Sequence, residues 1–143
     1  MDKTKVLVID DEQGIRDLFI QALEDDDYEV LTVDNGEEGL DIIKNEKPNV
    51  IFLDLKLPGI DGLEVLKSIS DLESKPIVIM ITGHGTIAKA AKTMDLGAYD
   101  YIVKPFDIDD IIKLMKQALK IDKLEKDVTS FRDQLKGQEG DQE

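Results

Sequence analysis

The feature that most constrains this fold is the regular alternation of short apolar runs with segments of helical periodicity. Runs such as 5–9 (KVLVI), 50–53 (VIFL) and 77–81 (IVIMI) are typical of strands buried on both faces of a sheet. After the first run, apolar residues such as Ile15 and Phe19 recur at the spacing of an amphipathic helix. This alternation predicts parallel βαβ units with right-handed crossovers.

The pattern predicts five strands and five helices. The expected strands are 5–9, 29–33, 50–53, 77–81 and 99–103. The first expected helix includes Ile15–Leu23, the second runs from an N-cap at Asn35 to about Asn45, and the third includes Leu63–Ile69. The fourth ends near Gly97, and the fifth begins at about Ile108 and shows no clear stop before Gly137. Segment 29–33 alternates in polarity and is predicted at an edge of the sheet. We therefore expect an α/β fold, a doubly wound five-stranded parallel sheet with an extended C-terminal helix.

Composition narrows the classes of function. The 143 residues suit one domain with a real core, and the net charge of −14 opposes binding to nucleic-acid phosphates, so we expect no direct nucleic-acid binding. The chain has no cysteine, which excludes disulfides and makes the cytoplasm the natural location. Its longest apolar run is far shorter than the roughly 20 residues of a membrane span, so no membrane association is expected.

Polar residues follow four of the predicted strands. Asp10, Asp11 and Glu12 follow the first strand, Asp54 the third, Thr82 the fourth, and Lys104 with Pro105 the fifth. The carboxyl ends of parallel strands meet at one edge, where ligands bind in such sheets. Clustered carboxylates favour a hard cation, so this edge is a candidate Mg²⁺ site.

A carboxylate beside Mg²⁺, a hydroxyl and an ammonium can attack a phosphoryl group and form an acyl phosphate. The metal and the ammonium would neutralise charge on the transferring group. Asp54 comes directly after an apolar strand that would fix its position, which makes it the candidate nucleophile. Asp10 and Asp11 are then the candidate metal ligands.

The segments VLVIDDE, VIFLDLKLPGIDG, IMITGHG and GAYDYIVKPF follow one another in an order and at separations that resemble the receiver domains of two-component response regulators. The resemblance covers residues 5 to about 120 and implies a flavodoxin-like sheet of order 2-1-3-4-5. It also implies phosphorylation by a sensor histidine kinase. Such a domain would catalyse only its own phosphorylation and dephosphorylation and would not be an enzyme in the usual sense.

Position by position, the resemblance implies a role for each strand-end residue. Asp54 matches the phosphoacceptor and, with Asp10, Asp11 and the backbone carbonyl of Lys56, would hold Mg²⁺. Thr82 matches the switch hydroxyl, Lys104 the lysine that pairs with the phosphoryl group, and Tyr101 the aromatic residue that moves inward on activation. In this family the bond before the residue matching Pro105 is typically cis.

Nearby residues have weaker assignments. His84 is the only histidine and has no evident partners for catalysis or metal binding, so we expect a loop residue that modulates access to the phosphoryl group. Lys56 either tunes hydrolysis of the acyl phosphate or is a solvated lysine. Asp61 and Gly62 are interpreted as residues of the loop and the helix start, and not as ligands.

The chain continues beyond the expected end of such a domain. We divide it into a receiver domain (1–120), a helical linker and candidate coiled coil (121–136) and a disordered tail (137–143). In the linker, five apolar residues follow heptad spacing: Ile121, Leu124, Val128, Phe131 and Leu135, hereafter the seam. Either a second copy of the chain or an effector domain outside it is expected to cover the seam. We expect a homodimer.

The function has one leading interpretation and three alternatives. The segments ITGHGT and GAYDYIVKPF resemble those of receivers from nitrogen-regulator-class, sigma-54-dependent transcription activators. The chain has no GxxxxGK[ST] loop and no DNA-reading motif, so the ATPase and DNA-binding activities of such activators are not expected in it. A stand-alone or hybrid-kinase receiver in a phosphorelay is the alternative. A Mg²⁺-dependent haloacid-dehalogenase-type phosphatase is more distant, because it requires a DxD motif after the first strand. A flavin-binding protein would need a phosphate-cradling loop where this chain has Asp10, Asp11 and Glu12.

Overall fold

The computed structural model describes residues 3–24, 27–83 and 87–141, and its elements alternate strand and helix throughout. The strands are β1 (Thr4–Ile9), β2 (Tyr28–Val33), β3 (Val50–Asp54), β4 (Ile77–Thr82) and β5 (Asp100–Val103). The helices are α1 (Gln13–Ala22), α2 (Gly36–Glu46), α3 (Gly62–Ser70), α4 (Ile87–Asp95) and α5 (Ile108–Asp141). Each predicted element is present.

All strands are parallel, and the sheet has the order β2-β1-β3-β4-β5. This confirms the predicted doubly wound sheet and places the alternating strand β2 at an edge. The registers pair Ile9 with Leu53 and Leu53 with Met80, so the carboxyl ends of the central strands lie level with one another. The residues that follow these strands therefore share one edge.

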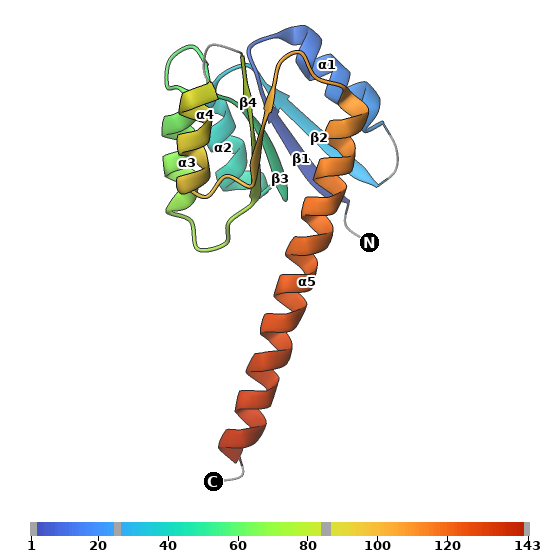
Figure 1. The fold of residues 1–143 in the computed structure, drawn as a ribbon, viewed down its shortest axis with the longest axis vertical. Coiled ribbons are helices and arrows are strands. Elements are labelled where there is room, and N and C mark those ends of the chain that lie inside the picture. The colour runs from blue at the N-terminus through green and yellow to red at the C-terminus, as the bar shows by residue number, and fades with distance from the viewer. Residues whose placement is uncertain (1–2, 25–26, 84–86, 142–143) are drawn as a thin grey trace.

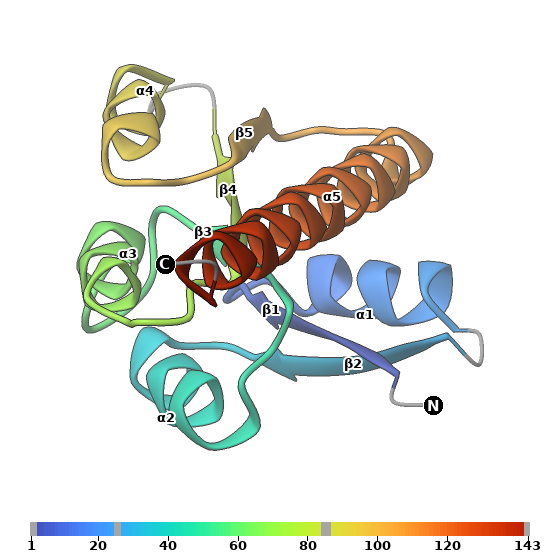
Figure 2. The ribbon, with the colours of Figure 1, turned by 90° about the horizontal axis from the view of Figure 1, so that it is seen from below.

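Helices cover both faces of the sheet. Viewed from below, α1 and α5 lie on one side and α2, α3 and α4 on the other (Figure 2). Successive residues of β1 alternate between the two faces: Val6 and Val8 pack with α1 and α5, and Leu7 and Ile9 pack with α2 and α3. These four side chains are fully buried, which explains why the run is apolar at every position.

Two helix starts confirm the predicted caps. The Asn35 side chain accepts a hydrogen bond from the Glu38 N–H at the start of α2, with an O···N distance of 2.9 Å. Asp61 accepts one from the Glu64 N–H at 3.0 Å and so begins α3. Asp61 is thus a residue of the helix start, as the sequence indicated.

Helix α5 leaves the body of the domain and continues alone (Figure 1). The five side chains of the seam are between 38% and 61% exposed. The helix runs to Asp141, past Gly137 and past residue 136, where the linker was predicted to end. Glycine costs a helix only about 1 kcal/mol relative to alanine and can be accommodated within a turn. None of the described helices combines the length and apolar character of a bilayer span.

Candidate functional site

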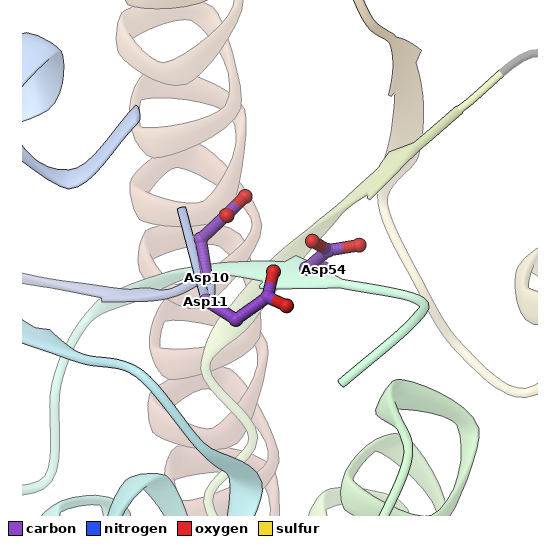
Figure 3. A group of neighbouring side chains, drawn as sticks. All are labelled: Asp10, Asp11 and Asp54. Carbon is purple, nitrogen blue, oxygen red and sulfur yellow. The ribbon is translucent and has the colours of Figure 1, made fainter. Parts of the chain in front are cut away.

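The carboxylates that follow β1 and β3 meet at the edge of the sheet. Figure 3 shows Asp10 and Asp11 from the end of β1 beside Asp54 at the end of β3. One carboxylate oxygen from each residue lies within 4.8 Å of the other two. Asp10 and Asp54 are buried, whereas Asp11 is exposed to solvent. The sequence predicted this grouping from the common carboxyl edge of parallel strands, and the pairing of β1 with β3 brings the residues side by side.

Asp10 is held by the first turn after β1. Its Oδ1 accepts a hydrogen bond from the Glu12 N–H at 2.8 Å, and its backbone carbonyl accepts one from Arg16 Nη1 at 2.8 Å. Its Oδ2 is buried and receives no hydrogen bond within the described residues. The Lys104 ammonium is 3.1 Å from this oxygen, at ion-pair distance but not in hydrogen-bonding geometry. Asp10 therefore keeps a buried oxygen with unused capacity for a ligand.

Asp54 is the last residue of β3 and is held by its own loop. Its Oδ1 accepts a hydrogen bond from the Lys56 N–H at 3.1 Å, and its Oδ2 accepts one from Lys104 Nζ at 3.2 Å. Gly62 packs against the strand end, where an added Cβ would overlap the carbonyl oxygen of Asp54. Both oxygens of the carboxylate thus have fixed positions.

Lys104 supplies positive charge to this cluster. Its backbone N–H donates to the Thr82 carbonyl at 2.8 Å, which continues the pairing of β4 with β5. Its ammonium lies 3.1 Å from Asp10 Oδ2, 3.2 Å from Asp54 Oδ2 and 3.4 Å from Glu12 Oε1. A single ammonium is therefore shared among three carboxylates, which leaves excess negative charge for a further cation.

Burial shapes the proton affinities of these groups. It raises the pKa of Asp54 to about 6, with the Asp10 charge adding to the rise and Lys104 opposing it. Burial also raises the pKa of Asp10, against the lowering effects of the Glu12 N–H and Lys104. Burial by itself would lower the pKa of Lys104, but Asp10 and Asp54 outweigh it and the net shift is upward. Lys104 therefore stays charged at neutral pH.

The remaining predicted residues lie along β4 and β5. Thr82 is fully buried at the end of β4, and its hydroxyl donates to the Gly83 carbonyl at 3.1 Å. Tyr101 pairs with Met80 in the sheet register and packs, half-buried, against the core on the α2–α3 face. The Lys104–Pro105 peptide bond is cis. His84 lies outside the described residues.

Sequence reasoning gave no role to Glu12 or Arg16. Glu12 supplies both a backbone donor to Asp10 and a carboxylate near Lys104, and Arg16 holds the Asp10 carbonyl. Glu12 carried a signal, because it extends the acidic run after β1. Arg16 carried no such signal. Its partner is a backbone carbonyl, which every residue type has, so the contact leaves no pattern in the sequence.

The donor set fits a hard divalent cation. Carboxylate oxygens are preferred by Mg²⁺, and Asp10, Asp11 and Asp54 present three of them close together. The buried Oδ2 of Asp10 accepts no hydrogen bond among the described residues and has only the Lys104 ammonium beside it. When bound, Mg²⁺ would neutralise charge on a transferring phosphoryl group.

Comparisons with known proteins agree with this geometry. The response regulator receiver domain family matches residues 6–116. The chain is 36% identical over 121 residues to sporulation initiation phosphotransferase F of Bacillus subtilis, covering 85% of this chain and 98% of that protein. It is 40% identical over 129 residues to a putative NtrX-like response regulator of Rickettsia typhi, covering 89% of this chain but only 27% of that protein.

Solved structures show the same fold. NtrX from Brucella abortus, crystallised with ADP, superimposes with a TM-score of 0.82 at 38% identity, over 90% of this chain and 30% of that one. The chain therefore spans less than a third of the NtrX-type proteins it resembles, and nearly all of the phosphotransferase.

Proposed function

Because this chain belongs to the response regulator receiver domain family, we propose that Asp54 accepts a phosphoryl group from a sensor histidine kinase. The supporting observation is the position of Asp54: it is buried at the end of β3, 3.2 Å from the Lys104 ammonium and beside Asp10 and Asp11. Receiver domains accept phosphate from such kinases, and this placement supplies the nucleophile, the counter-charge and the metal ligands.

The transfer forms one bond and breaks another. A carboxylate oxygen of Asp54 attacks phosphorus, the bond between phosphorus and the kinase imidazole nitrogen breaks, and the imidazole takes up a proton. Lys104 pairs with the oxygens of the transferring group, and the Lys56 N–H holds the carboxylate in place. Asp10, Asp11, Asp54 and the Lys56 carbonyl would hold the Mg²⁺ ion. In this proposal the chain catalyses only its own phosphorylation and dephosphorylation.

Thr82 and Tyr101 form the proposed switch. Phosphoryl oxygens on Asp54 would draw the buried Thr82 hydroxyl away from the Gly83 carbonyl, and Tyr101 would move into the space that Thr82 leaves. The phosphoryl group thus biases a pair of side-chain arrangements. Thr82→Ala should permit phosphorylation while abolishing the accompanying NMR shift of Tyr101.

The output is proposed to be regulation of transcription through an effector domain outside this chain. The similarity to NtrX-type regulators supports it, because the chain covers only 27% of the NtrX-like protein of Rickettsia typhi and 30% of the NtrX structure. A second candidate is a phosphorelay intermediate, supported by the 98% coverage of sporulation initiation phosphotransferase F. Transfer of phosphate from Asp54 onward to a histidine of a second protein would favour the relay. We place both roles in the cytoplasm, as the cysteine-free sequence suggests.

We further propose that two copies pair through α5. The seam is exposed and lies beyond the core of the domain, so its apolar side chains are free to bury one another. In a parallel pair aligned residue for residue, Lys120 of one copy would face Glu125 of the other, and Asp127 would face Arg132. At ~0.8 kcal/mol per buried CH₂, offset by the cost of association, such a short seam supports at best micromolar affinity.

Intact-mass measurement with acetyl phosphate and Mg²⁺ tests the phosphoacceptor. The wild-type protein should gain one phosphoryl group, and Asp54→Asn should gain none. Asp41→Asn removes an exposed carboxylate from α2 and serves as the matched control, which should behave as wild type. Equal gain in all three proteins would overturn the assignment of Asp54.

A further inference from the structure

The loop between β3 and α3, residues 55–61, is closed at its base. The Gly62 N–H donates to the Leu55 carbonyl at 3.0 Å, which joins the two ends of the loop. Near its start the Lys56 N–H is bound to Asp54 Oδ1. These contacts anchor the base of the loop, and the far side, around Gly59 and Ile60, needs a separate support.

Glu37, in the first turn of α2, supplies that support. Its Oε1 accepts a hydrogen bond from the Ile60 N–H at 3.1 Å, across 23 positions of sequence. Glu37 Oε1 also lies against Gly59, and a Cβ added to this glycine would lie 2.5 Å from that oxygen. The φ of Gly59 is 73°. The neighbouring Gly36 lets the helix approach Ile60, because a Cβ at Gly36 would lie 2.8 Å from Ile60 Cγ1.

We propose that Glu37 is a positioning residue for the Mg²⁺ site, acting through the loop that carries Lys56. The inference rests on the proposed function, in which the Lys56 carbonyl is a metal ligand. The loop is held at the Lys56 N–H by Asp54 and at the Ile60 N–H by Glu37, so the Lys56 carbonyl begins the stretch that runs between these two anchors. Release of the Glu37 anchor lets the loop sample other arrangements, and a ligand that must first be ordered binds a metal more weakly.

The alternative role for Glu37 is a general electrostatic one. An acidic residue in the first turn of a helix stabilises the helix through its dipole, and Glu37 and Glu38 are both in that turn. Glu38 serves the N-cap through its backbone N–H, which a side-chain substitution leaves in place. Glu38→Ala is therefore a matched control that removes the same charge from the same turn.

A Mg²⁺ titration by calorimetry tests the proposal. Glu37→Ala should raise the Kd for Mg²⁺ about 3- to 10-fold, as expected for the loss of one hydrogen bond that orders a ligand. Glu37→Gln keeps an acceptor for the Ile60 N–H and should stay close to wild type, although it removes the charge. Glu38→Ala should also stay close to wild type. Thermal unfolding of each variant checks that it is folded.

Gly59→Ala gives an independent route to the same loss. The new methyl group would displace the Glu37 carboxylate and is strained at positive φ, so Mg²⁺ affinity should fall as in Glu37→Ala. Because both changes release one anchor, the double variant should be little worse than either single variant. Unchanged affinity in Glu37→Ala, or equal weakening in Glu37→Gln, would overturn the positioning role alone. No Mg²⁺ binding by the wild type would overturn the proposed function as well.

Discussion

The strand-end site and the α5 extension are opposite kinds of incomplete surface. At the strand ends, buried carboxylates share the ammonium of Lys104, and Asp10 Oδ2 has no hydrogen bond among the described residues. Along α5, the seam presents apolar side chains that are up to 61% exposed. The first region offers oxygen ligands to a metal ion, and the second offers an apolar stripe to a partner.

The two regions also differ in how firmly they are held. The site residues extend directly from β1, β3, β4 and β5, whose apolar side chains pack on both faces of the sheet and are partly buried in β5 and buried in the other three. The seam is on a helix that extends past the domain body, where no other described element lies beside it (Figure 1). A preorganised polar site is suited to chemistry, whereas an unpartnered apolar stripe is suited to assembly. We therefore expect changes in the two regions to have separable effects.

The largest effect is expected from a substitution that disrupts the homodimer and leaves the strand-end site intact. Leu124→Glu places a charge in the apolar contact and should weaken a homodimer roughly 100-fold or more, because burying an unpaired charge is costly. Sedimentation at tens of micromolar should show a dimer for wild type and a monomer for the variant. A chain cut after Lys120 should also be mostly monomeric.

Lys123→Glu is the control for this experiment, because it adds a negative charge next to Leu124 but outside the seam. It should remain dimeric, and all variants should still be phosphorylated. Monomeric wild-type protein at these concentrations would contradict the pairing and would leave the seam to an effector domain.

A smaller effect is expected from a substitution that weakens the strand-end metal site and leaves the homodimer intact. Asp11→Asn removes a charged oxygen from the carboxylate cluster and should weaken Mg²⁺ binding about 10-fold. Calorimetric titration measures the affinity, and sedimentation should show an unchanged dimer. Asp11 is not a ligand if the two proteins have the same Mg²⁺ affinity.

The smallest effect concerns stability and pH. Burial raises the pKa of Asp54 from 3.8 to about 6, so between these values the folded protein keeps a proton that the unfolded chain has lost. Stability therefore falls as pH rises through this window. Without metal, Asp54→Asn should be about 1 kcal/mol more stable than wild type at pH 7.5, after allowance for its weaker contact with Lys104.

Urea unfolding in EDTA measures this difference. The gain in Asp54→Asn should shrink as the pH is lowered toward 4, because Asp54 is then protonated in the folded wild-type protein and no longer buries a charge. A gain that is the same at both pH values would exclude burial of the charge as its cause. Added Mg²⁺ should stabilise the wild type more than the variant.

Much of the fold and site could be predicted because the alternation of strands and helices indicates a parallel sheet, whose strands all end at one edge; the order of the strands was implied only by the family resemblance. The apolar runs fixed the strands, and the residue after each run then fell at the common edge. The predicted location of Asp10, Asp11, Asp54 and Lys104 together is confirmed. Their chemical roles stay predictions.

The parts that could not be predicted depend on contacts that leave little trace in the sequence. Arg16 binds the backbone of Asp10, and Glu37 binds the backbone of Ile60. Any residue can offer a carbonyl or an N–H, so neither pair shows a pattern. The extent of α5 was also not predicted, because the sequence shows no clear stop before Gly137 and a single glycine lowers helix stability only modestly.

Reduction of the phosphorylated protein with borohydride tests the central claim most directly. The reagent converts an aspartyl phosphate into homoserine, which peptide mass spectrometry can assign to one position. After treatment with acetyl phosphate and Mg²⁺, homoserine should appear at position 54, and it should be absent when Mg²⁺ is removed with EDTA. Homoserine at position 10 or 11, or a phosphoryl group retained on His84, would contradict the account.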